Sequence, residues 1–417
     1  MDGYADVIVI GGGIVGLSIA YRLVSNGYRV TIVDDSYSDD SRKASYGNAG
    51  YISPSLGPIS LTRGGLMDLI RWCILDGTVK ISKDFLLSIK NILWLKEFIN
   101  NREVSISNAK AIRDMALYAI EWYKRLSKII DFNYKANGLL EVYASGDALE
   151  NRLKYITSIC NKLNIRYQVL SKSQVKELEP RLKKAEHAIY YPDDAMLNPK
   201  ILVSNLRRLL SSMGVKFFNS IKHVEYCYHS NISSNMNTTC IDYVDLGNAR
   251  VRGEHYILCT GAYKVPFKHL TLPVVPARGY AIDINIMDNN EKMQREILNH
   301  AVLLGEHRIA LASFNSYMIR ASGFFELTSI GSKVRDSNFS FLYKHVNEHV
   351  ELGSNSIVER WVGYRPCTPN NMPIICKHYN YSNLIVAVGH CRLGVTLAPY
   401  TAELVCSIIQ GNINDDT

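Results

Sequence analysis

The hydrophobic pattern at the start of the chain predicts a strand, a turn, a helix and a second strand. Residues Asp6 to Ile10 form a short β-branched run that leads directly into glycines, as buried parallel strands do. An amphipathic stretch continues to Asn26, and Arg29 to Val33 form a second apolar run, which Asp34 and Asp35 follow. This order of elements, completed within about thirty residues, is typical of a dinucleotide-binding unit.

The turn of this unit has the glycine spacing that a bound pyrophosphate requires. Gly11 permits the tight turn, Gly13 lets the backbone approach the phosphates, and Gly16 lets helix and strand pack closely. Ile14 and Val15 open the helix, whose unpaired N–H groups and positive dipole end favour the phosphates. We therefore expect a dinucleotide at this turn.

The acidic pair after the second strand completes the predicted nucleotide site. Asp34 stands where a carboxylate accepts hydrogen bonds from the ribose hydroxyls of adenosine and disfavours a 2′-phosphate, and Asp35 follows it. Glycine turns also occur for steric reasons alone, so the prediction depends on finding both strands, the helix and the acid together.

The later pattern is richer in strands and ends on a second strand–glycine–helix unit. Asn198 and Pro199 are a good helix start, and the helix should end near Ser212. The last unit combines a buried strand, residues 384–388, with a helix, residues 397–410. We expect several helices between residues 61 and 126, helices at 148–163 and 337–349, strands at 138–143, 188–191, 216–219, 224–228, 240–244, 255–260 and 356–362, a polar hairpin tip at 231–239, and short strands between 274 and 330.

Two such units at the chain ends predict a discontinuous α/β domain. We expect a Rossmann-like dinucleotide-binding domain and an inserted α+β domain with a mixed sheet, because ligands bind where carboxyl ends of parallel strands meet. The predicted boundaries are 1–60, 145–268 and 356–417 for the cofactor domain, and 61–144 and 269–355 for the substrate domain.

Composition narrows the functional class. Of the 417 residues, 47% are hydrophobic and 21% are charged, which excludes a disordered or fibrous chain. The net charge of +8 is spread along the chain, whereas nucleic-acid binding needs a clustered basic stripe. The most apolar long stretch, residues 84–99, is broken by charges, so we expect no membrane span, and the N-terminus lacks the basic start of a secretory signal.

Cysteines and histidines argue against a metal site. The nine cysteines cannot all pair within the chain and contain no Cys-x-x-Cys motif, which predicts a reduced, cytoplasmic protein without a cysteine-based zinc or iron–sulfur site. His345 and His349 have the spacing of a zinc helix, but Val346 stands where the catalytic motif has glutamate. We expect this pair to be exposed on a helix and to bind no metal.

Four segments together resemble one enzyme family. They are GGGIVG at 11–16, GNAGYISPS at 47–55, ERWVGYRPCTPNNMPII at 359–375 and VGHCRLGVTLAP at 388–399. In this order they resemble the superfamily of FAD-dependent D-amino acid dehydrogenases and oxidases, most closely the bacterial D-amino acid dehydrogenases and the archaeal dye-linked proline dehydrogenases. The resemblance implies a D-amino acid oxidase type of fold and FAD as the dinucleotide.

The resemblance also implies which residues contact FAD. The loop at 36–56 is long enough to suggest a function rather than an ordinary surface loop, and in the family it contacts the ribityl and pyrophosphate groups. The C-terminal turn is expected at the flavin ring, where its helix dipole stabilises the reduced ring. Arg392 replaces a usually small residue there, and its charge either lies near the ring or points to solvent. The implied positions are Ser45, Asn48, Ala49, Gly50, Ile52, Val224, Thr260, Gly261, Gly363, His390, Arg392, Leu393, Gly394, Val395 and Thr396, besides the N-terminal turn and Arg365.

Arg365 is the strongest candidate for substrate binding. It matches the arginine that holds the substrate carboxylate in the family, and a planar guanidinium can make two parallel charge-assisted bonds to a carboxylate. A structural arginine paired with an acid is the alternative. Gly363 stands where sarcosine-type relatives carry the cysteine that bonds to the flavin, so we expect non-covalent FAD. His307, Tyr51 and Tyr280 are weaker candidates for the substrate side, with packing roles as the alternative.

The function that the resemblance implies is oxidation of a D-amino acid to a 2-imino acid, which water converts to a 2-oxo acid. The electrons are expected to reach a quinone or an artificial dye, and the basic surface allows peripheral membrane contact. Two alternatives stay open: a dye-linked D- or L-proline dehydrogenase, and a flavin subunit that acts only with partner chains.

Overall fold

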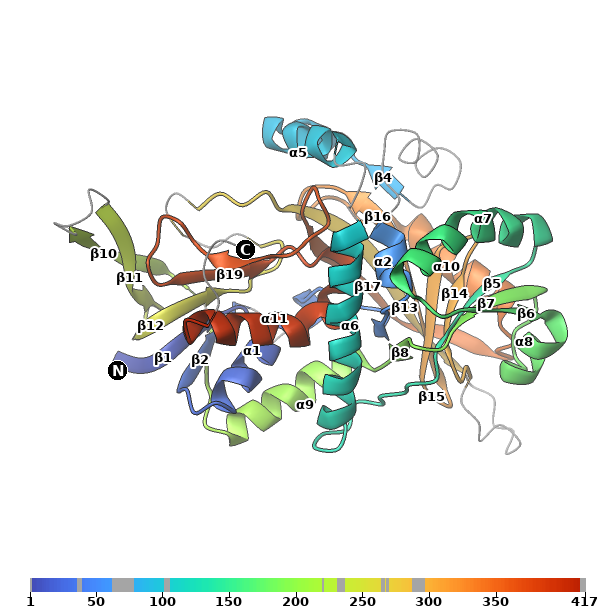
Figure 1. The fold of residues 1–417 in the computed structure, drawn as a ribbon, viewed down its shortest axis with the longest axis horizontal. Coiled ribbons are helices and arrows are strands. Elements are labelled where there is room, and N and C mark those ends of the chain that lie inside the picture. Colours follow the sequence, from blue (N-terminus) through green and yellow to red (C-terminus); the bar gives the residue numbers. More distant parts are fainter. Residues whose placement is uncertain are drawn as a thin grey trace. The chain divides into compact units, whose positions relative to one another are not determined.

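The chain divides into two compact units, each assembled from separate parts of the sequence (Figure 1). Unit 1 contains residues 1–46, 203–274 and 365–417, and unit 2 contains residues 47–202 and 275–364. The computed structural model describes residues 2–35, 40–61, 79–100, 106–219, 221–230, 237–263, 267, 270–286 and 297–412.

Unit 1 is built on an eight-stranded sheet that joins the two chain ends. Its parallel strands are, in spatial order, β9 (Lys216–Phe218), β2 (Val30–Val33), β1 (Asp2–Ile10), β12 (Arg250–Leu258) and β19 (Leu384–Val388). Three strands extend the sheet by antiparallel pairing: β10 (His223–Ser230), β11 (Asn237–Asp245) and β18 (Ile374–Lys377).

Helices α1 (Ile14–Val24) and α11 (Gly394–Ile409) pack against each other within unit 1 (Figure 1). Every residue of β2 and of β19 is buried, which explains why the sequence shows continuous rather than alternating apolar runs there. The first and last glycine turns therefore lie at the carboxyl ends of strands in one sheet.

Unit 2 contains a nine-stranded mixed sheet. Its path is β17 (Asn355–Cys367), β13 (Val275–Ile286), β16 (Met318–Leu327), β15 (Ile309–Asn315), β14 (Ala301–Leu304), β5 (Leu139–Tyr143), β7 (His187–Tyr191) and β6 (Gln168–Ser171), with β4 (Val79–Ile81) beside β16. A separate pair joins β3 (Tyr51–Ile52) to β8 (Ala195–Met196). The helices are α2 (Leu56–Leu61), α4 (Lys83–Leu86), α5 (Ile89–Asn100), α6 (Ile106–Leu126), α7 (Gly146–Leu163), α8 (Lys172–Leu178), α10 (Asp336–His349) and α9 (Pro199–Ser212), the last of which continues into unit 1.

One face of the unit 2 sheet packs on α10. Alternate residues of β13 and β16, such as Ile282 and Ile319, share a buried cluster with Phe339 and Leu342 of α10. Tyr280 belongs to the same cluster, and its ring centroid lies 5.3 Å from that of Phe339. This face is therefore a hydrophobic core.

The opposite face of the same strands is polar. Asp283 of β13 and Arg320 of β16 point there, because side chains alternate along a strand. The segment that begins at Gly47 lies against this face: Arg320 donates to the carbonyl oxygen of Asn48 over 3.1 Å. The unit thus has one face for packing and one face that holds the predicted flavin-contacting segment.

The structure confirms the predicted class of fold and corrects the predicted domain boundaries. Residues 145–202 belong to unit 2, because β6 and β7 pair with β5 in its sheet. The helix predicted from Pro199 to Ser212 and the strand at 384–388 have the expected bounds. β4 and β18 were not predicted, and residues 231–236 of the predicted hairpin tip lie outside the described residues.

Candidate functional site

The N-terminal glycine turn forms a tight backbone cradle at the end of β1. Gly11 has φ +111°, and a Cβ on Gly16 would lie 2.0 Å from the carbonyl oxygen of Gly11. A Cβ on Gly11 would lie 2.5 Å from the carbonyl oxygen of Cys259, so the turn also abuts Thr260 at the end of β12. Side chains are therefore excluded where the turn, helix and neighbouring strand meet.

Helix α1 opens beside this turn without a side-chain cap. Its N-cap is Gly13, and the backbone N–H of Ile14 donates to Ser45 Oγ over 3.1 Å. An uncapped helix N-terminus favours an anion through its N–H groups and dipole. The structure thus brings Ser45 to the turn, and the arrangement suits a phosphate.

A charged network covers the end of β2. Lys43 Nζ lies 2.9 Å from Asp34 Oδ2 and 2.7 Å from Asp40 Oδ1, and its side chain is only 6% exposed. Arg207 also donates to Asp40. Burial raises the pKa of Asp40, but its bonds to Arg207 and Lys43 outweigh burial and lower it. Asp34 is therefore held by a buried lysine beside the glycine turn.

The other predicted positions of unit 1 differ in their surroundings. Asp35 accepts a hydrogen bond from the N–H of Ile221 over 3.0 Å, so it fixes the chain after β9. Val224 is fully buried in the hydrophobic core, where its side chain cannot reach a ligand. Gly261 has φ +62° and open space around its missing Cβ.

The C-terminal turn contains His390, Cys391 and Arg392, whereas the first turn consists mainly of glycines. His390 is 4% exposed, and burial lowers its pKa to about 4, so the ring is neutral near pH 7. Thr401 donates its hydroxyl hydrogen to Leu397, so His390 Nε2 must donate to Thr401 Oγ1, 2.9 Å away. Helix α11 follows without a side-chain cap at Leu393, and Val395 and Thr396 are buried in its first turn. His390 therefore positions the turn as a neutral donor.

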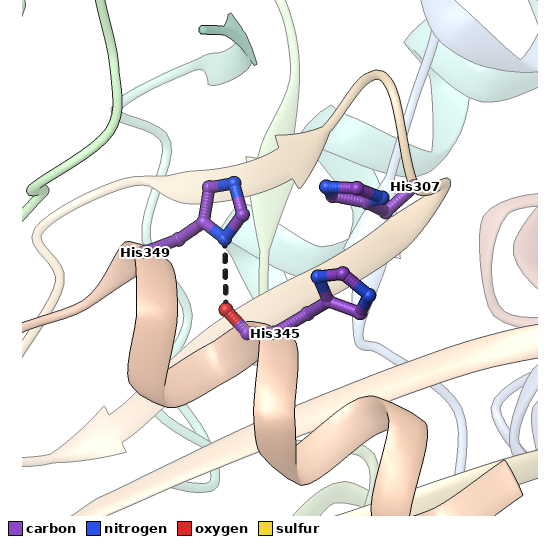
Figure 2. A group of neighbouring side chains, drawn as sticks. All are labelled: His307, His345 and His349. Atoms are coloured by element: carbon purple, nitrogen blue, oxygen red, sulfur yellow. Dashed lines mark hydrogen bonds between the residues drawn. The ribbon is translucent and has the colours of Figure 1, made fainter.

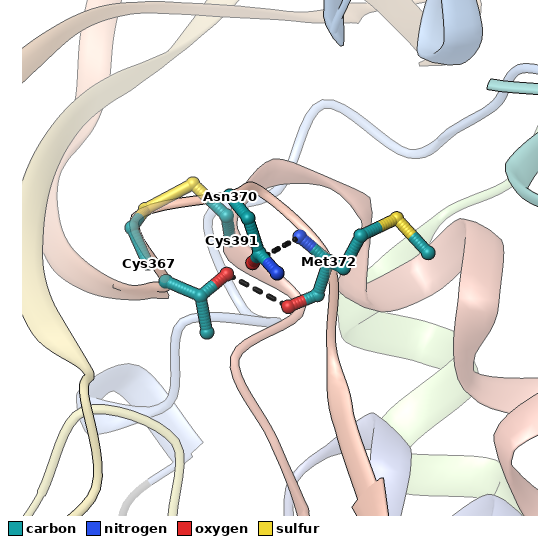
Figure 3. The surroundings of a disulfide bond; sticks show 5 residues. Cys367, Asn370, Met372 and Cys391 are labelled. Atoms are coloured by element: carbon teal, nitrogen blue, oxygen red, sulfur yellow. Dashed lines mark hydrogen bonds between the residues drawn. A yellow bond between two sulfur atoms is a disulfide. The ribbon is translucent and has the colours of Figure 1, made fainter. Parts of the chain in front are cut away.

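A disulfide fastens this turn to the end of β17. It joins Cys367 and Cys391, which are separated by 24 residues (Figure 3). Cys391 has φ +45°, and the hydroxyl of Thr368 donates to the carbonyl oxygen of Met372 beside it. The prediction of a fully reduced protein is therefore wrong, because the fold brings together two cysteines that are distant in sequence.

Two arginines lie close together in this part of unit 1. Burial, and then the positive charge of Arg392, lower the pKa of Arg365 to about 10. Arg365 is partly buried, whereas Arg392 is exposed. The charge of Arg392 thus disfavours the charged form of Arg365, whereas a nearby anion would favour it.

In unit 2, Trp361 organises the predicted flavin-contacting segment. A Cβ on Gly47 would lie 1.9 Å from the indole of Trp361, and a Cβ on Gly363 would lie 2.1 Å from it. The N–H of Gly50 donates to Asn48 Oδ1 over 2.7 Å, and a Cβ on Gly50 would lie 2.0 Å from the carbonyl oxygen of Leu197. Glycines are thus required by backbone and indole contacts at these three positions.

A buried ionic network lies under this segment. Arg320 contacts both carboxylate oxygens of Asp283, at 2.7 and 2.9 Å, and Lys200 bridges Asp283 to Glu359. Burial raises the pKa of Asp283, but the bonds and charges of Arg320 and Lys200 outweigh burial and lower it. The network fixes Asn48 through Arg320 and so holds the loop in place.

The comparison with known proteins agrees with this geometry. A model of the DAO family, described as FAD dependent oxidoreductase, matches residues 6–408. The chain belongs to this family. It is 26% identical over 422 residues to the D-amino acid dehydrogenase of Helicobacter pylori (strain ATCC 700392 / 26695), covering 98% of this chain and 96% of that protein.

Two solved structures of similar fold extend this comparison. Glycine oxidase from Geobacillus kaustophilus matches with a TM-score of 0.71 and 18% identity, covering 99% of this chain and 96% of its own. L-proline dehydrogenase from P. horikoshii matches with a TM-score of 0.65 and 16% identity, covering 99% and 95%. At these identities the structural matches show the fold alone.

The residues of unit 1 fit the FAD that this family uses. Gly11, Gly13 and Gly16 leave room for a pyrophosphate at an uncapped helix, and Asp34 stands at the end of the neighbouring strand. The C-terminal turn presents a second uncapped helix. FAD, when bound, supplies a two-electron acceptor. The predicted contacts of residues 48–52 with FAD, and its non-covalent attachment, stay predictions.

The weaker substrate candidates are not brought together. The hydroxyl of Tyr51 lies 2.7 Å from the carbonyl oxygen of Val302 and 2.8 Å from that of Leu311, so it ties β3 to the sheet, and Ile52 is buried beside it. Burial raises the pKa of Tyr51 far above its usual value, so the hydroxyl stays protonated.

Tyr280 and His307 require a correction. Tyr280 is fully buried on the face that packs on α10, and its hydroxyl donates to Glu326 over 2.9 Å. His307 stacks on His345 of α10, with ring centroids 3.9 Å apart. Both therefore lie on the helix-covered face, whereas the segment at 47–50 lies on the other face of the sheet.

Sequence reasoning missed Lys43, Arg320, Trp361 and the Cys367–Cys391 pair. The resemblance covers Trp361, Cys367 and Cys391, which lie in quoted segments, but it gives none of them a role; Cys391, like Arg392, stands where the family usually has a small residue. Lys43 and Arg320 acquire their roles only through partners far along the chain, so no local pattern identifies them.

Proposed function

We propose that this flavoenzyme is a D-amino acid dehydrogenase, which oxidises its substrate to a 2-imino acid that water converts to a 2-oxo acid and ammonia. The observation that carries this proposal is the proximity of Arg365 and Arg392 beside the C-terminal turn. A substrate carboxylate is an anion that suits this pair, and the Helicobacter pylori relative acts on D-amino acids by its name.

Arg365 serves in this proposal as the carboxylate clamp. Its strand, β17, is fastened to the C-terminal turn by the disulfide two residues later, so the backbone that carries Arg365 is held in place. Two parallel N–H donors fix both the position and the rotation of a carboxylate. That fixation aims the substrate Cα–H bond in one direction, which is the main geometric requirement of the oxidation.

The electron acceptor in this proposal is a quinone in a membrane or a dye that replaces it. An apolar patch on α4 and α5 supports membrane contact. Its members are Leu86, Leu87, Ile89, Ile92 and Leu93, which are 45%, 86%, 77%, 48% and 59% exposed. Lys83, Lys90 and Lys96 accompany the patch, and Trp94 anchors the helix on its buried side. Exposed apolar groups flanked by lysines favour an anionic lipid surface. None of the described helices has the length and hydrophobicity needed to cross a bilayer.

A substrate panel tests the proposed activity. Purified protein is assayed with D- and L-amino acids, including both prolines, with an artificial dye and with or without air. Dye reduction by D-amino acids, faster than peroxide formation in air, is the expected result. Preference for proline would support the proline dehydrogenase alternative, and inactivity of a yellow, folded chain would point to a missing partner subunit.

Vesicle sedimentation tests the apolar patch. The double variant Leu87→Glu/Ile89→Glu should bind anionic phospholipid vesicles several-fold more weakly than the unaltered protein. Val358→Glu is the matched control, because Val358 is an apolar residue that is 55% exposed on β17. Equal binding by both variants would remove the patch from the proposal and leave the amino acid chemistry untouched.

A further inference from the structure

Three histidines come together on the helix-covered face of unit 2 (Figure 2). His345 and His349 lie on α10, and His307 lies in the turn between β14 and β15. One ring nitrogen of each lies within 4.8 Å of the others. The expectation that the helical pair is exposed is therefore wrong: His349 is 5% exposed, and the side chain of His345 is 12% exposed.

His345 and His349 on α10 have the spacing of two histidines that bind the same metal ion. Residues four apart lie one above the other on a helix face, so both rings can reach the same side. The ring centroid of His307 lies 3.9 Å from that of His345 and 5.2 Å from that of His349. His307 therefore adds a third ring from a different element. The cluster thus joins a helix to a strand turn.

Hydrogen bonding prepares His349 to act as a ligand. Its Nδ1 lies 2.9 Å from the backbone carbonyl oxygen of His345, so Nδ1 must donate, and in the neutral form of the ring Nε2 carries the lone pair (Figure 2). Metal-binding histidines commonly have their second nitrogen fixed in this way. Figure 2 shows the second nitrogen of His349 turned away from that carbonyl, on the side of His307.

His345 gives a second, independent indication. Its Nδ1 is buried and has no hydrogen-bond partner, and Glu348 Oε2 lies 3.7 Å away. A buried polar atom without a partner costs free energy, which a bound ion would recover. Burial, and then the charge of His307, lower the pKa of His345 to about 4, and burial also lowers that of His307.

We propose that His307, His345 and His349 bind one divalent transition-metal ion, with zinc as the best match. Imidazole nitrogen suits zinc, nickel and copper, whereas calcium and magnesium prefer oxygen. Three histidines leave a fourth position for water. Zinc–nitrogen bonds of about 2.0–2.1 Å place tetrahedral ligands about 3.4 Å apart, so the rings close by small side-chain rotations. The bound ion links α10 to the β14–β15 turn and so stabilises this face of the sheet.

A histidine cluster that serves only in packing is the competing explanation. Phe341 lies against His345, with ring centroids 4.3 Å apart, so aromatic packing does contribute. Packing alone does not explain the buried ring nitrogen of His345 that has no hydrogen-bond partner. The two explanations differ in a measurable property, which is stoichiometric metal binding.

Zinc titration of the chelator-treated holoenzyme tests the proposal, with calorimetry for affinity and metal analysis after dialysis for stoichiometry. We expect about one zinc per chain, and a rise in melting temperature on zinc addition. His307→Gln and His345→Gln should each weaken binding at least about tenfold and remove the rise in melting temperature. His223→Gln is the control, because His223 lies on β10 with a side chain that is 51% exposed.

The melting temperature of each chelator-treated variant shows whether it folds. His307 lies in a turn, so its variant tests the site even where a change on α10 disturbs the helix. Absence of zinc binding at concentrations up to about 100 μM, or equal affinity in His307→Gln and the unaltered protein, would overturn the proposal. Neither result depends on the proposed amino acid oxidation, because the readout is metal binding.

Discussion

The two glycine turns of unit 1 occupy equivalent places and are built differently. Each follows a buried parallel strand, β1 or β19, and each leads into a helix without a side-chain cap. The first excludes side chains and offers only backbone to a ligand. The second carries His390, Cys391 and Arg392. The contrast fits our expectation that the first turn binds a pyrophosphate through its backbone, whereas the second turn carries a charged side chain and a disulfide.

Adding one methyl group to each turn should separate the two turns in both stability and flavin retention. Gly16→Ala places a Cβ 2.0 Å from the carbonyl oxygen of Gly11, whereas Gly394 has open space around its missing Cβ. Gly16→Ala should lower the free energy of unfolding by about 1–3 kcal/mol or more and abolish flavin retention. Gly394→Ala should leave the melting temperature of flavin-free protein unchanged or slightly raised, because alanine favours helix. Thermal unfolding of flavin-free protein measures both, and equal stability of the two variants would refute the contrast.

The disulfide is the next feature that distinguishes the turns. Cys391→Ser should lower the free energy of unfolding by about 2–4 kcal/mol, because the bond closes a loop of moderate length. Cys376→Ser is the control, since Cys376 is an exposed cysteine that lies outside the Cys367–Cys391 bond. Urea unfolding gives the energies, and thiol titration of denatured, unreduced protein shows whether the bond is present. A variant as stable as the unaltered protein would show that the link contributes nothing.

Acid should lower the free energy of unfolding through His390, which lies in the second turn. Burial holds the pKa of His390 at about 4, below the value of about 6.5 in an unfolded chain. The unfolded state therefore binds a proton first, so stability is complete above about pH 6.5 and is lost as pH falls toward 4. The loss attributable to His390 reaches about 3 kcal/mol at most. Urea unfolding of His390→Gln at pH 7 and pH 5 checks this: the variant should lose less stability between the two pH values than the unaltered protein.

The smallest effect is expected from removing the carboxylate of Asp34, beside the first turn. Asp34→Ala removes one partner of Lys43, which keeps Asp40, so the fold should persist. FAD affinity should fall about tenfold, since a charged hydrogen bond contributes roughly 1.5–3 kcal/mol. Asp35→Ala is the matched control. Flavin fluorescence on titration of flavin-free protein measures the affinity, and unaltered binding would exclude Asp34 as the ribose partner.

The sequence predicted the first turn more completely than the second. The roles of Gly11, Gly13 and Gly16 follow from local backbone geometry, and a local pattern reports local geometry. The Cys367–Cys391 bond and the Lys43–Asp34 pair depend on which distant segments the fold brings together. The prediction of FAD as the cofactor is confirmed, the pyrophosphate role of the turn stays a prediction, and the prediction of a reduced protein is wrong.

Unit 2 shows the same limit. The strands around His307 and Tyr280 were anticipated, but the face to which Tyr280 points depends on the irregularity of register between Arg278 and Tyr280, and His307 lies in a turn. One residue of register moves a side chain to the other face. Tyr280 consequently lies in the core, and His307 meets His345 rather than the loop at 47–50.

The carboxylate clamp is the central claim, and the specificity of Arg365→Leu tests it most directly. The measurement is kcat/KM for a D-amino acid and for the corresponding amine without a carboxylate, with Arg360→Leu as control because Arg360 is an exposed arginine of the same strand. We expect at least about a hundredfold loss for the amino acid in Arg365→Leu, a smaller loss in Arg365→Lys, a much smaller loss for the amine, and normal FAD content. A leucine variant that keeps its flavin and near-normal kcat/KM for amino acids would contradict the clamp and the choice of an amino acid as substrate.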